Sequence, residues 1–218
     1  MTDSRAAQFA GLGTATISDA LDRYALNGTL LGIAPLAEGQ RMIGRAYTVR
    51  YISAGNPPGT VGDYIDDVQP GDVVVLENAG RMDCTVWGDI LTAVASVRGI
   101  SGTVIDGVCR DTTRAITTGY PIFSRGRFMR TGKDRVEVAA VQEPVTVGGV
   151  LVRPGDLLVG DSDGVVVIPQ DREAEVLESA RVIHDKEASI LADALSGSTI
   201  AEARKRFGYH DLQKKVNR

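Results

Sequence analysis

Lysine is absent from the first 132 of the 218 residues, and Lys133 is the only lysine before Lys186. A Schiff-base enzyme needs a desolvated lysine on or beside a core strand, so imine chemistry is not expected here. A Walker-type phosphate loop needs Gly-Lys followed by Ser or Thr, and the single Gly-Lys pair of this sequence precedes Asp134. Neither Schiff-base nor nucleotide-dependent catalysis fits this chain.

Cysteine, histidine and long apolar runs are also scarce. Cys84 and Cys109 are too few for a disulfide framework and are expected to be free thiols, with Cys109 buried. His184 and His210 lie in a polar C-terminal region without an elbow motif, which indicates surface residues rather than a catalytic triad. Because no signal peptide and no apolar run of ~18 residues is found, we expect a cytoplasmic protein without a membrane partner.

The charge pattern argues against a nucleic-acid partner. The formal net charge is −4, and residues 204–218 carry six Lys or Arg against Asp211. That tail is therefore +5, and the remaining chain is −9. A predominantly acidic chain with one short basic end lacks the broad basic face that nucleic acids require.

Apolar periodicity predicts an α/β fold. A helix is expected over 14–26, with Thr16 and Asp19 as its capping pair, and another from Asp89 to Gly99 with an apolar face. That face comprises Ile90, Leu91, Ala93, Val94 and Val97. Further elements are strands over 41–53, 73–77, 103–107 and 121–126, and a short helix after Arg110. Strands alternating with helices imply parallel βαβ crossovers.

The second half of the chain has a different pattern. After Gly132 short aliphatic segments alternate with strong turns, which predicts antiparallel strands, whereas 78–83 reads as a polar connection. A helix follows from Arg172 to Ala194, with its inward residues extending to Ala188 and Leu191, and a second short helix begins near Thr199. No linker interrupts the chain, so we expect one domain over 1–218 with a helical extension from about residue 172.

Polar residues that could take part in catalysis or binding lie where predicted strands and helices meet. Asp89 opens a helix, Arg110 and Asp111 follow the strand over 103–107, and twenty residues lie between Asp89 and Arg110. One crossover helix and one strand span that distance, so both points can return to the same edge of the sheet. The spacing predicts a small concave anion site.

The residue types suit a metal-assisted reaction on a carboxylate. The first-turn amides of Ile90 and Leu91 lack helical partners and can bind a carboxylate, which Arg110 can grip bidentately. Asp89 and Asp111 remain for a hard cation, Mg²⁺ or Mn²⁺ rather than Zn²⁺. A 2-oxo acid would be able to chelate such a cation.

A structural interpretation of the same residues stays open. Asp89 would then cap its helix, and Arg110 with Asp111 would form a surface ion pair. Trp87 is expected to pack against the wall of the site. A basic stretch farther along is either a contact for a second substrate carboxylate or a solvated surface. It consists of Arg125, Arg127, Arg130 and Lys133.

The sequence resembles the RraA-like family over most of its length. The resemblance rests on TATISDAL, GDVVVLENAG, WGDILTAVASVRGISGTVIDGVCRD, PIFSRG and PGDLLVGDSDGVVVIP. The spacing of Asp89 from Arg110 and Asp111 is its most specific part. The family includes divalent-metal 4-hydroxy-4-methyl-2-oxoglutarate and 4-carboxy-4-hydroxy-2-oxoadipate aldolases. The resemblance implies an α/β/β sandwich of the swivelling-domain type and a homotrimer or hexamer with sites at subunit interfaces.

The resemblance also implies roles for individual residues. Asp111 would ligate the metal directly, Asp89 would do so through water, and Glu187 of a neighbouring subunit is a candidate third acid. Arg110 and Asp89 would be the catalytic residues, with Arg110 polarising the oxo group. The implied substrate-binding residues are Gly88, Ile90, Leu91 and Arg110.

The expected activity is metal-dependent cleavage of a 2-oxo acid to pyruvate. Arg114 departs from the aldolases, which often carry Glu or Asp three residues after the metal-binding aspartate. Oxaloacetate decarboxylation is therefore the first activity to expect, because it needs only loss of CO₂, and aldol cleavage is the second. The rivals are a non-enzymatic regulator of an endoribonuclease, which the family also contains, and a methyltransferase, whose Gly-rich loop is not found.

Overall fold

A computed structural model describes residues 3–212, 214 and 215. Arg218, the last cation of the basic tail, lies outside the described residues. The helices are α1 (Ser4–Ala7), α2 (Thr14–Arg23), α3 (Asp89–Arg98), α4 (Thr112–Thr118), α5 (Glu173–Leu195) and α6 (Ile200–Phe207), with 3₁₀ turns η1 (Asp63–Asp66), η2 (Gln170–Arg172) and η3 (Tyr209–Asp211). The strands are β1 (Ala34–Pro35), β2 (Met42–Ser53), β3 (Val73–Thr85), β4 (Gly102–Cys109), β5 (Ile122–Arg127), β6 (Val136–Val141), β7 (Val145–Val147), β8 (Val150–Val152), β9 (Leu157–Asp161) and β10 (Gly164–Ile168).

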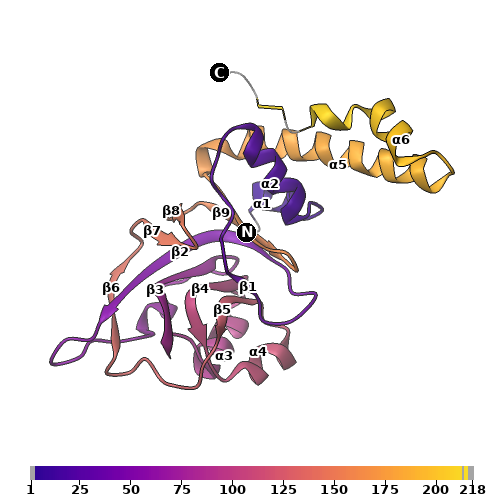
Figure 1. Cartoon of the computed structure of the whole chain (residues 1–218). Coiled ribbons are helices and arrows are strands. Elements are labelled where there is room, and N and C mark those ends of the chain that lie inside the picture. Colours follow the sequence, from indigo (N-terminus) through magenta and orange to yellow (C-terminus); the bar gives the residue numbers. More distant parts are fainter. Residues whose placement is uncertain (1–2, 213, 216–218) are drawn as a thin grey trace.

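A mixed sheet organises the molecule, with strand order β1-β5-β4-β3-β2-β9-β10 and β6 paired to β2. The pairs β2–β3, β3–β4 and β4–β5 are parallel, as the predicted βαβ crossovers require. The strands after β5 pair antiparallel, which confirms the expected change of character. In Figure 1, α3 and α4 lie below the parallel strands, β7–β10 lie above them, and α1, α2 and α5 form the top layer. The expected α/β/β sandwich with C-terminal helices is confirmed.

Alternation along β3 divides two hydrophobic cores. Val74 and Leu76 face the core between the sheet and α3, whereas Val73 and Val75 face the core shared with β7–β10. The prediction that 78–83 is a polar connection was wrong, because β3 continues through it to Thr85. Ala79 and Gly80 have positive φ angles of 50° and 67°, and the pairing register with β4 shifts there. Such an irregularity lets a strand continue through polar residues.

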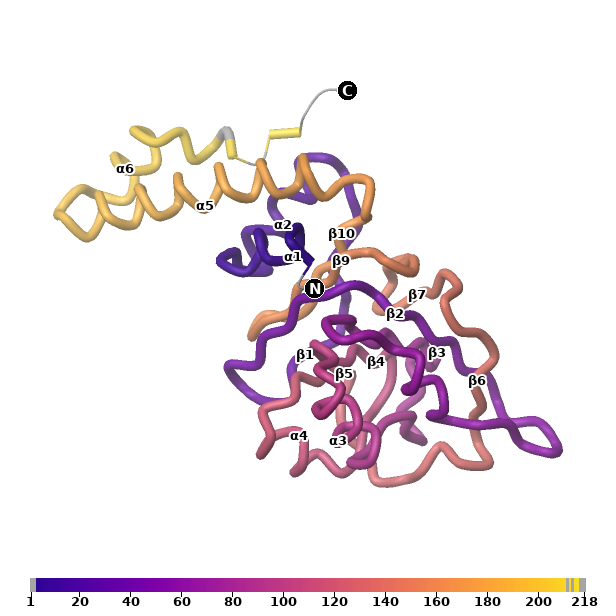
Figure 2. Tube along the Cα trace, turned by 180° about the vertical axis from the view of Figure 1, so that it is seen from behind, coloured from indigo at the N-terminus to yellow at the C-terminus, as the bar shows by residue number. Residues whose placement is uncertain are grey.

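The C-terminal helices form a third layer and then leave it. Val176 and Ile183 of α5 are buried on α1, α2, β9 and β10. Farther along, α5 and α6 project together from the body as an arm (Figure 2). Ala188 and Leu191 were predicted to point inward, but both are exposed because the arm extends past the sheet that would cover them. Among the helices that the structure describes, none has the length and apolar character to cross a membrane.

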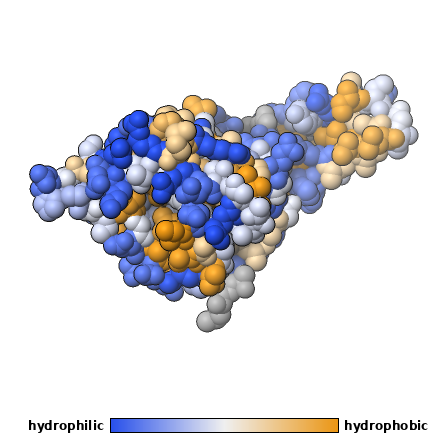
Figure 3. Space-filling model, turned by 90° about the horizontal axis from the view of Figure 1, so that it is seen from below, coloured by the Kyte–Doolittle hydropathy of each residue, from blue (hydrophilic) through white to orange (hydrophobic). Residues whose placement is uncertain are grey.

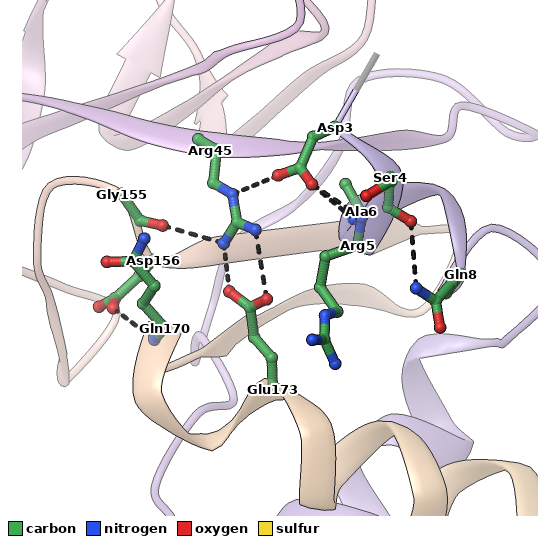
Figure 4. A network of polar contacts seen from close by, with 10 residues as sticks. All are labelled: Asp3, Ser4, Arg5, Ala6, Gln8, Arg45, Gly155, Asp156, Gln170 and Glu173. Carbon is green, nitrogen blue, oxygen red and sulfur yellow. Dashed lines mark hydrogen bonds and ion pairs between the residues drawn. The ribbon is translucent and has the colours of Figure 1, made fainter.

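Arg45 connects three parts of the chain that lie far apart in sequence (Figure 4). Its guanidinium in β2 binds Asp3 ahead of α1, Glu173 at the start of α5, and the Gly155 carbonyl at 3.2 Å. The second Arg45–Glu173 hydrogen bond is 3.2 Å long. The Glu173 side chain is only 6% exposed, so its charge depends on Arg45 for compensation.

Replacing Arg45 by Met is expected to lower the free energy of unfolding by about 2–4 kcal/mol, because it leaves the buried Glu173 carboxylate without its partner. Urea denaturation measures this change. Asp3→Asn is the matched comparison: Asp3 is 34% exposed, so its loss should cost less than the loss of Arg45. Equal stabilities of Arg45→Met and wild type would contradict this account.

Candidate functional site

The structure brings Asp89 together with Arg110 and Asp111 at the carboxyl edge of the parallel strands. Asp89 is the first residue of α3, and Arg110 and Asp111 follow β4. The Arg110 amide donates to the Trp87 carbonyl at 3.0 Å, which joins the two connections directly. Arg110 Nε lies 3.2 Å from Asp111 Oδ2, and both side chains are less than half exposed.

Gly88 allows this close approach. A Cβ atom at residue 88 would lie 2.9 Å from Asp111 Oδ2 and 3.4 Å from Arg110 Nε. The backbone of Gly88 is extended, with φ −144°, so the need for glycine here is steric rather than conformational. Any side chain at this position would occupy the space in which the carboxylate of Asp111 now lies.

The N-terminus of α3 is free to bind a ligand. Its N-cap is Gly88, without a side-chain cap, and Asp89 is the first helical residue. The structural interpretation of Asp89 as the capping residue is therefore wrong. The first helical bond runs from the Thr92 amide to the Gly88 carbonyl at 3.1 Å. The amides of Ile90 and Leu91 precede it and have no carbonyl one turn earlier to bind.

Only part of the expected apolar face of α3 is buried. Ile90 is 75% exposed and Val97 is 89% exposed, contrary to the prediction from periodicity. The residues buried against the sheet are Thr92 and Ala95. Leu91 and Val94 of the predicted face are partly buried and pack against the same core. Figure 3, seen from below, shows hydrophobic side chains gathered on this face.

A cavity of about 240 Å³ opens at the N-terminus of α3. Asp89, Ile90, Leu91 and Arg110 line it, together with Lys133 from the far connection. Trp87 forms part of its wall, as expected, and is 1% exposed. The Trp87 indole stacks on Tyr120 and donates to Thr92 Oγ1 at 2.9 Å, which holds the wall in place.

Lys133 is the member of the basic stretch that reaches this cavity. The three arginines of the basic stretch do not line the cavity. Their partners are Asp106 for Arg125, the Leu36 carbonyl for Arg127 and the Phe128 ring for Arg130. The sequence could not separate these four cations, because Asp106 and Leu36 lie on other segments of the chain and only the fold brings them to Arg125 and Arg127.

The donor set at the site fits a hard divalent cation that keeps most of its waters. Asp89 and Asp111 expose 46% and 44% of their side chains, and both line a depression beside this cavity. Among the described residues, no group of three or more His, Cys, Asp or Glu is placed to hold a metal ion. Two carboxylates without nitrogen or sulfur donors match Mg²⁺ or Mn²⁺ better than Zn²⁺.

Glu187 lies elsewhere in the single chain. It belongs to α5, and it does not line the cavities that contain Asp89. Burial and the nearby Asp19 carboxylate raise the pKa of Glu187, while a hydrogen bond with Thr16 opposes that shift. That Glu187 contributes its carboxylate to the site of a neighbouring subunit stays a prediction.

A second, shallower depression of about 510 Å³ adjoins the first, and Asp89 lines both. Its other lining residues are Asp111, Thr113, Arg114, Thr117 and Thr118. Arg114 Nε lies 4.0 Å from Asp89 Oδ2. From the sequence, Arg114 was only a departure from the aldolase pattern. Its proximity to Asp89 depends on the packing of α4 beside α3.

The remaining candidate nucleophiles and bases are not at the site. Cys109 is buried, burial raises the pKa of its thiol, and its sulfur contacts Ser124 Oγ at 3.8 Å. The expectation of a buried structural thiol is confirmed. His184 and His210 are exposed on the C-terminal segment, as expected.

Sequence comparisons agree on one family. The profile of the RraA-like family, described as Aldolase/RraA, matches residues 14–167. Protein DlpA of Legionella pneumophila is 40% identical over 214 residues, which cover 97% of this chain and 35% of DlpA. A protein of Halalkalibacterium halodurans named "Putative 4-hydroxy-4-methyl-2-oxoglutarate aldolase" is 39% identical over 176 residues, or 80% of each chain. The chain thus spans about a third of DlpA and most of the second relative.

Solved structures share the fold. A crystal structure of an uncharacterized protein from Pseudomonas syringae pv. tomato superposes with a TM-score of 0.87 at 46% identity, covering 92% of this chain and 96% of the other. Streptomyces coelicolor RraAS2, described as an unusual member of the RNase ES inhibitor RraA family, has a TM-score of 0.77 at 30% identity. That match covers 85% of this chain and 95% of RraAS2.

Trp87 provides a test of ligand binding in the cavity, because it is the sole tryptophan and lines the wall. Titration with oxalate in the presence of Mg²⁺ should change its emission saturably. Gly88→Ala is expected to weaken the apparent affinity at least about tenfold, equivalent to ~1.4 kcal/mol, by displacing Asp111 and Arg110.

Stability should respond far less than affinity. The atoms displaced in Gly88→Ala are the ends of side chains, so urea denaturation should show a loss below about 1 kcal/mol. Gly11→Ala is the matched control, since a Cβ there would meet nothing within 4 Å. Unchanged oxalate affinity in Gly88→Ala would contradict the crowding described for Gly88.

Proposed function

This chain belongs to the RraA-like family, and on that premise we propose that it is a divalent-metal-dependent carbon–carbon lyase that releases pyruvate from 2-oxo acids. The observation that carries the proposal is the convergence of Asp89, Arg110 and Asp111 beside the free N-terminus of α3. The aldolase name of the Halalkalibacterium relative supports lyase activity.

In this proposal some residues of the site bind the substrate and others stabilise the charge that develops during cleavage. The amides of Ile90 and Leu91 donate hydrogen bonds to the substrate carboxylate at the positive end of α3. The fork of Arg110 donates to that carboxylate and to the 2-oxo oxygen. As the carbon–carbon bond breaks, negative charge develops on this oxygen, and a guanidinium already in place stabilises it without reorganisation. Lys133 adds a second positive charge to the wall of the cavity.

Asp111 would hold Mg²⁺ or Mn²⁺ directly and Asp89 would hold it through water, and the cation would polarise the 2-oxo group as a Lewis acid. Arg110 keeps Asp111 oriented through their ion pair. Asp89 would position a water and, through it, take up the hydroxyl proton of an aldol substrate on its carboxylate. We further propose a homotrimer or hexamer in which Glu187 of the partner subunit approaches this site.

Two substrates follow from this chemistry. Oxaloacetate needs only to lose CO₂, whereas a substrate of the 4-hydroxy-4-methyl-2-oxoglutarate type must also lose a hydroxyl proton. Both leave the same pyruvate enolate, so one site can serve both. Decarboxylation demands fewer positioned groups and is the activity to measure first.

A second candidate function is regulation of a ribonuclease by protein contact, because the chain is similar to RraAS2, whose family is described as RNase ES inhibitors. Regulation by contact would not need Asp89, Arg110 and Asp111 beside a free helix N-terminus. Capture of a ribonuclease, together with absence of pyruvate from every 2-oxo acid tested, would favour regulation over the lyase.

Asp111→Asn is expected to reduce pyruvate release from oxaloacetate to the rate of the free metal ion, because the carboxylate that holds the cation is removed. EDTA should have the same effect on the wild type. A coupled pyruvate assay measures both. Asp163→Asn, at an exposed turn position, is the control and should keep wild-type activity. Full activity of Asp111→Asn would reject this mechanism.

Arg110→Lys is expected to lower kcat/KM for oxaloacetate at least about tenfold, since a point charge cannot replace a bidentate fork. Steady-state kinetics measure the loss. Arg98→Lys, at the other end of α3, tests whether any arginine exchange has this effect. A value for Arg110→Lys within about threefold of wild type would speak against bidentate binding.

A further inference from the structure

Arg114 supplies positive charge to the second depression. The guanidinium lies on α4, 50% exposed, and its one ion pair within residues 3–212, 214 and 215 is the 4.0 Å contact with Asp89. At that distance the contact is at the limit of an ion pair, and no side-chain hydrogen bond accompanies it in the same residues. The donors of Arg114 therefore remain available to a ligand.

The other residues around this depression carry no positive charge. The Thr117 hydroxyl donates to the Thr113 carbonyl at 2.9 Å, and the Thr118 hydroxyl donates to the Arg114 carbonyl at 2.8 Å. These protons are used within α4. Asp89 and Asp111 repel anions, and the proposed cation would offset their charge. An anionic group that enters this depression would find Arg114 as its charged partner.

Asp89 links the two depressions, because it lines both. Arg110 lines the first depression only, and Arg114 lines the second only. A ligand held by its 2-oxo acid end at the N-terminus of α3 can therefore extend past Asp89 toward Arg114. The part that extends is the half that leaves when the carbon–carbon bond breaks.

We propose that Arg114 is a specificity-determining residue that binds a second carboxylate, carried on the leaving half of the 2-oxo acid. This inference rests on the proposed function and assigns the residue that recognises the leaving half of the substrate. Arginine suits this role because its planar fork matches a carboxylate. The carboxylate would take the donors of Arg114 that the loose contact with Asp89 leaves free.

Two unreactive ligands test the assignment by binding alone. 2-Oxoglutarate and 2-oxopentanoate have the same chain length and differ in a terminal carboxylate against a methyl group. With Mg²⁺ present, isothermal titration of the wild type should give a Kd at least about tenfold lower for 2-oxoglutarate. In Arg114→Gln the two Kd values should differ by less than about threefold, and Arg114→Lys should give an intermediate ratio.

Arg98→Gln is the matched control, because Arg98 is also a helical arginine with one aspartate partner, Asp66 at 3.3 Å. It should keep the wild-type ratio. Equal Kd values in the wild type, or a ratio preserved in Arg114→Gln, would overturn the role of Arg114. Pyruvate release from oxaloacetate by the wild type tests the proposed function separately. Its absence, together with absence of binding by both ligands, would reject the lyase itself.

Discussion

The candidate site depends on one contact between two connections, the hydrogen bond from the Arg110 amide to the Trp87 carbonyl. Parallel strands deliver their following loops to the same edge of a sheet, but they do not bring side chains within bonding distance. That last approach is made by the backbone pair and by the missing side chain of Gly88, where a Cβ would meet Asp111 at 2.9 Å. Trp87 then fixes the wall by stacking on Tyr120.

Much of this arrangement was predictable because it follows from local patterns and a general topological rule. The β-branched runs of β3 and β4, the helix opening at Asp89 and the glycine stop at Gly99 are all encoded within a few residues. The parallel direction of β3 and β4 then places the loops that follow them at the same edge of the sheet. Lys133 could not be assigned in this way, since its place in the cavity depends on a long connection crossing back over Thr85.

The sequence-based predictions were wrong where contacts with residues far away in the sequence decide the local structure. Thr16 and Asp19 were expected to cap α2, but the N-cap is Gly13, and Asp161 from β9 accepts from the Thr14 amide at 2.8 Å. Periodicity likewise marks an apolar face without saying what covers it. Ile90 on α3 and Leu191 on α5 both continue an apolar pattern, and both point away from the sheet layers. Their exposure is decided by how far each helix extends and how it rotates on its neighbours.

The charges around Asp89 explain why the departure at residue 114 is compatible with a 2-oxo acid site. Arg110, Arg114 and Lys133 contribute three positive charges to the two depressions, against two negative charges from Asp89 and Asp111. A divalent cation would raise this balance to +3, which a substrate with a single carboxylate leaves largely uncompensated. Each further carboxylate on the substrate lowers that excess. A cation at residue 114 in place of an acid would therefore shift the proposed site toward multiply charged substrates without removing any group that the proposed cleavage requires.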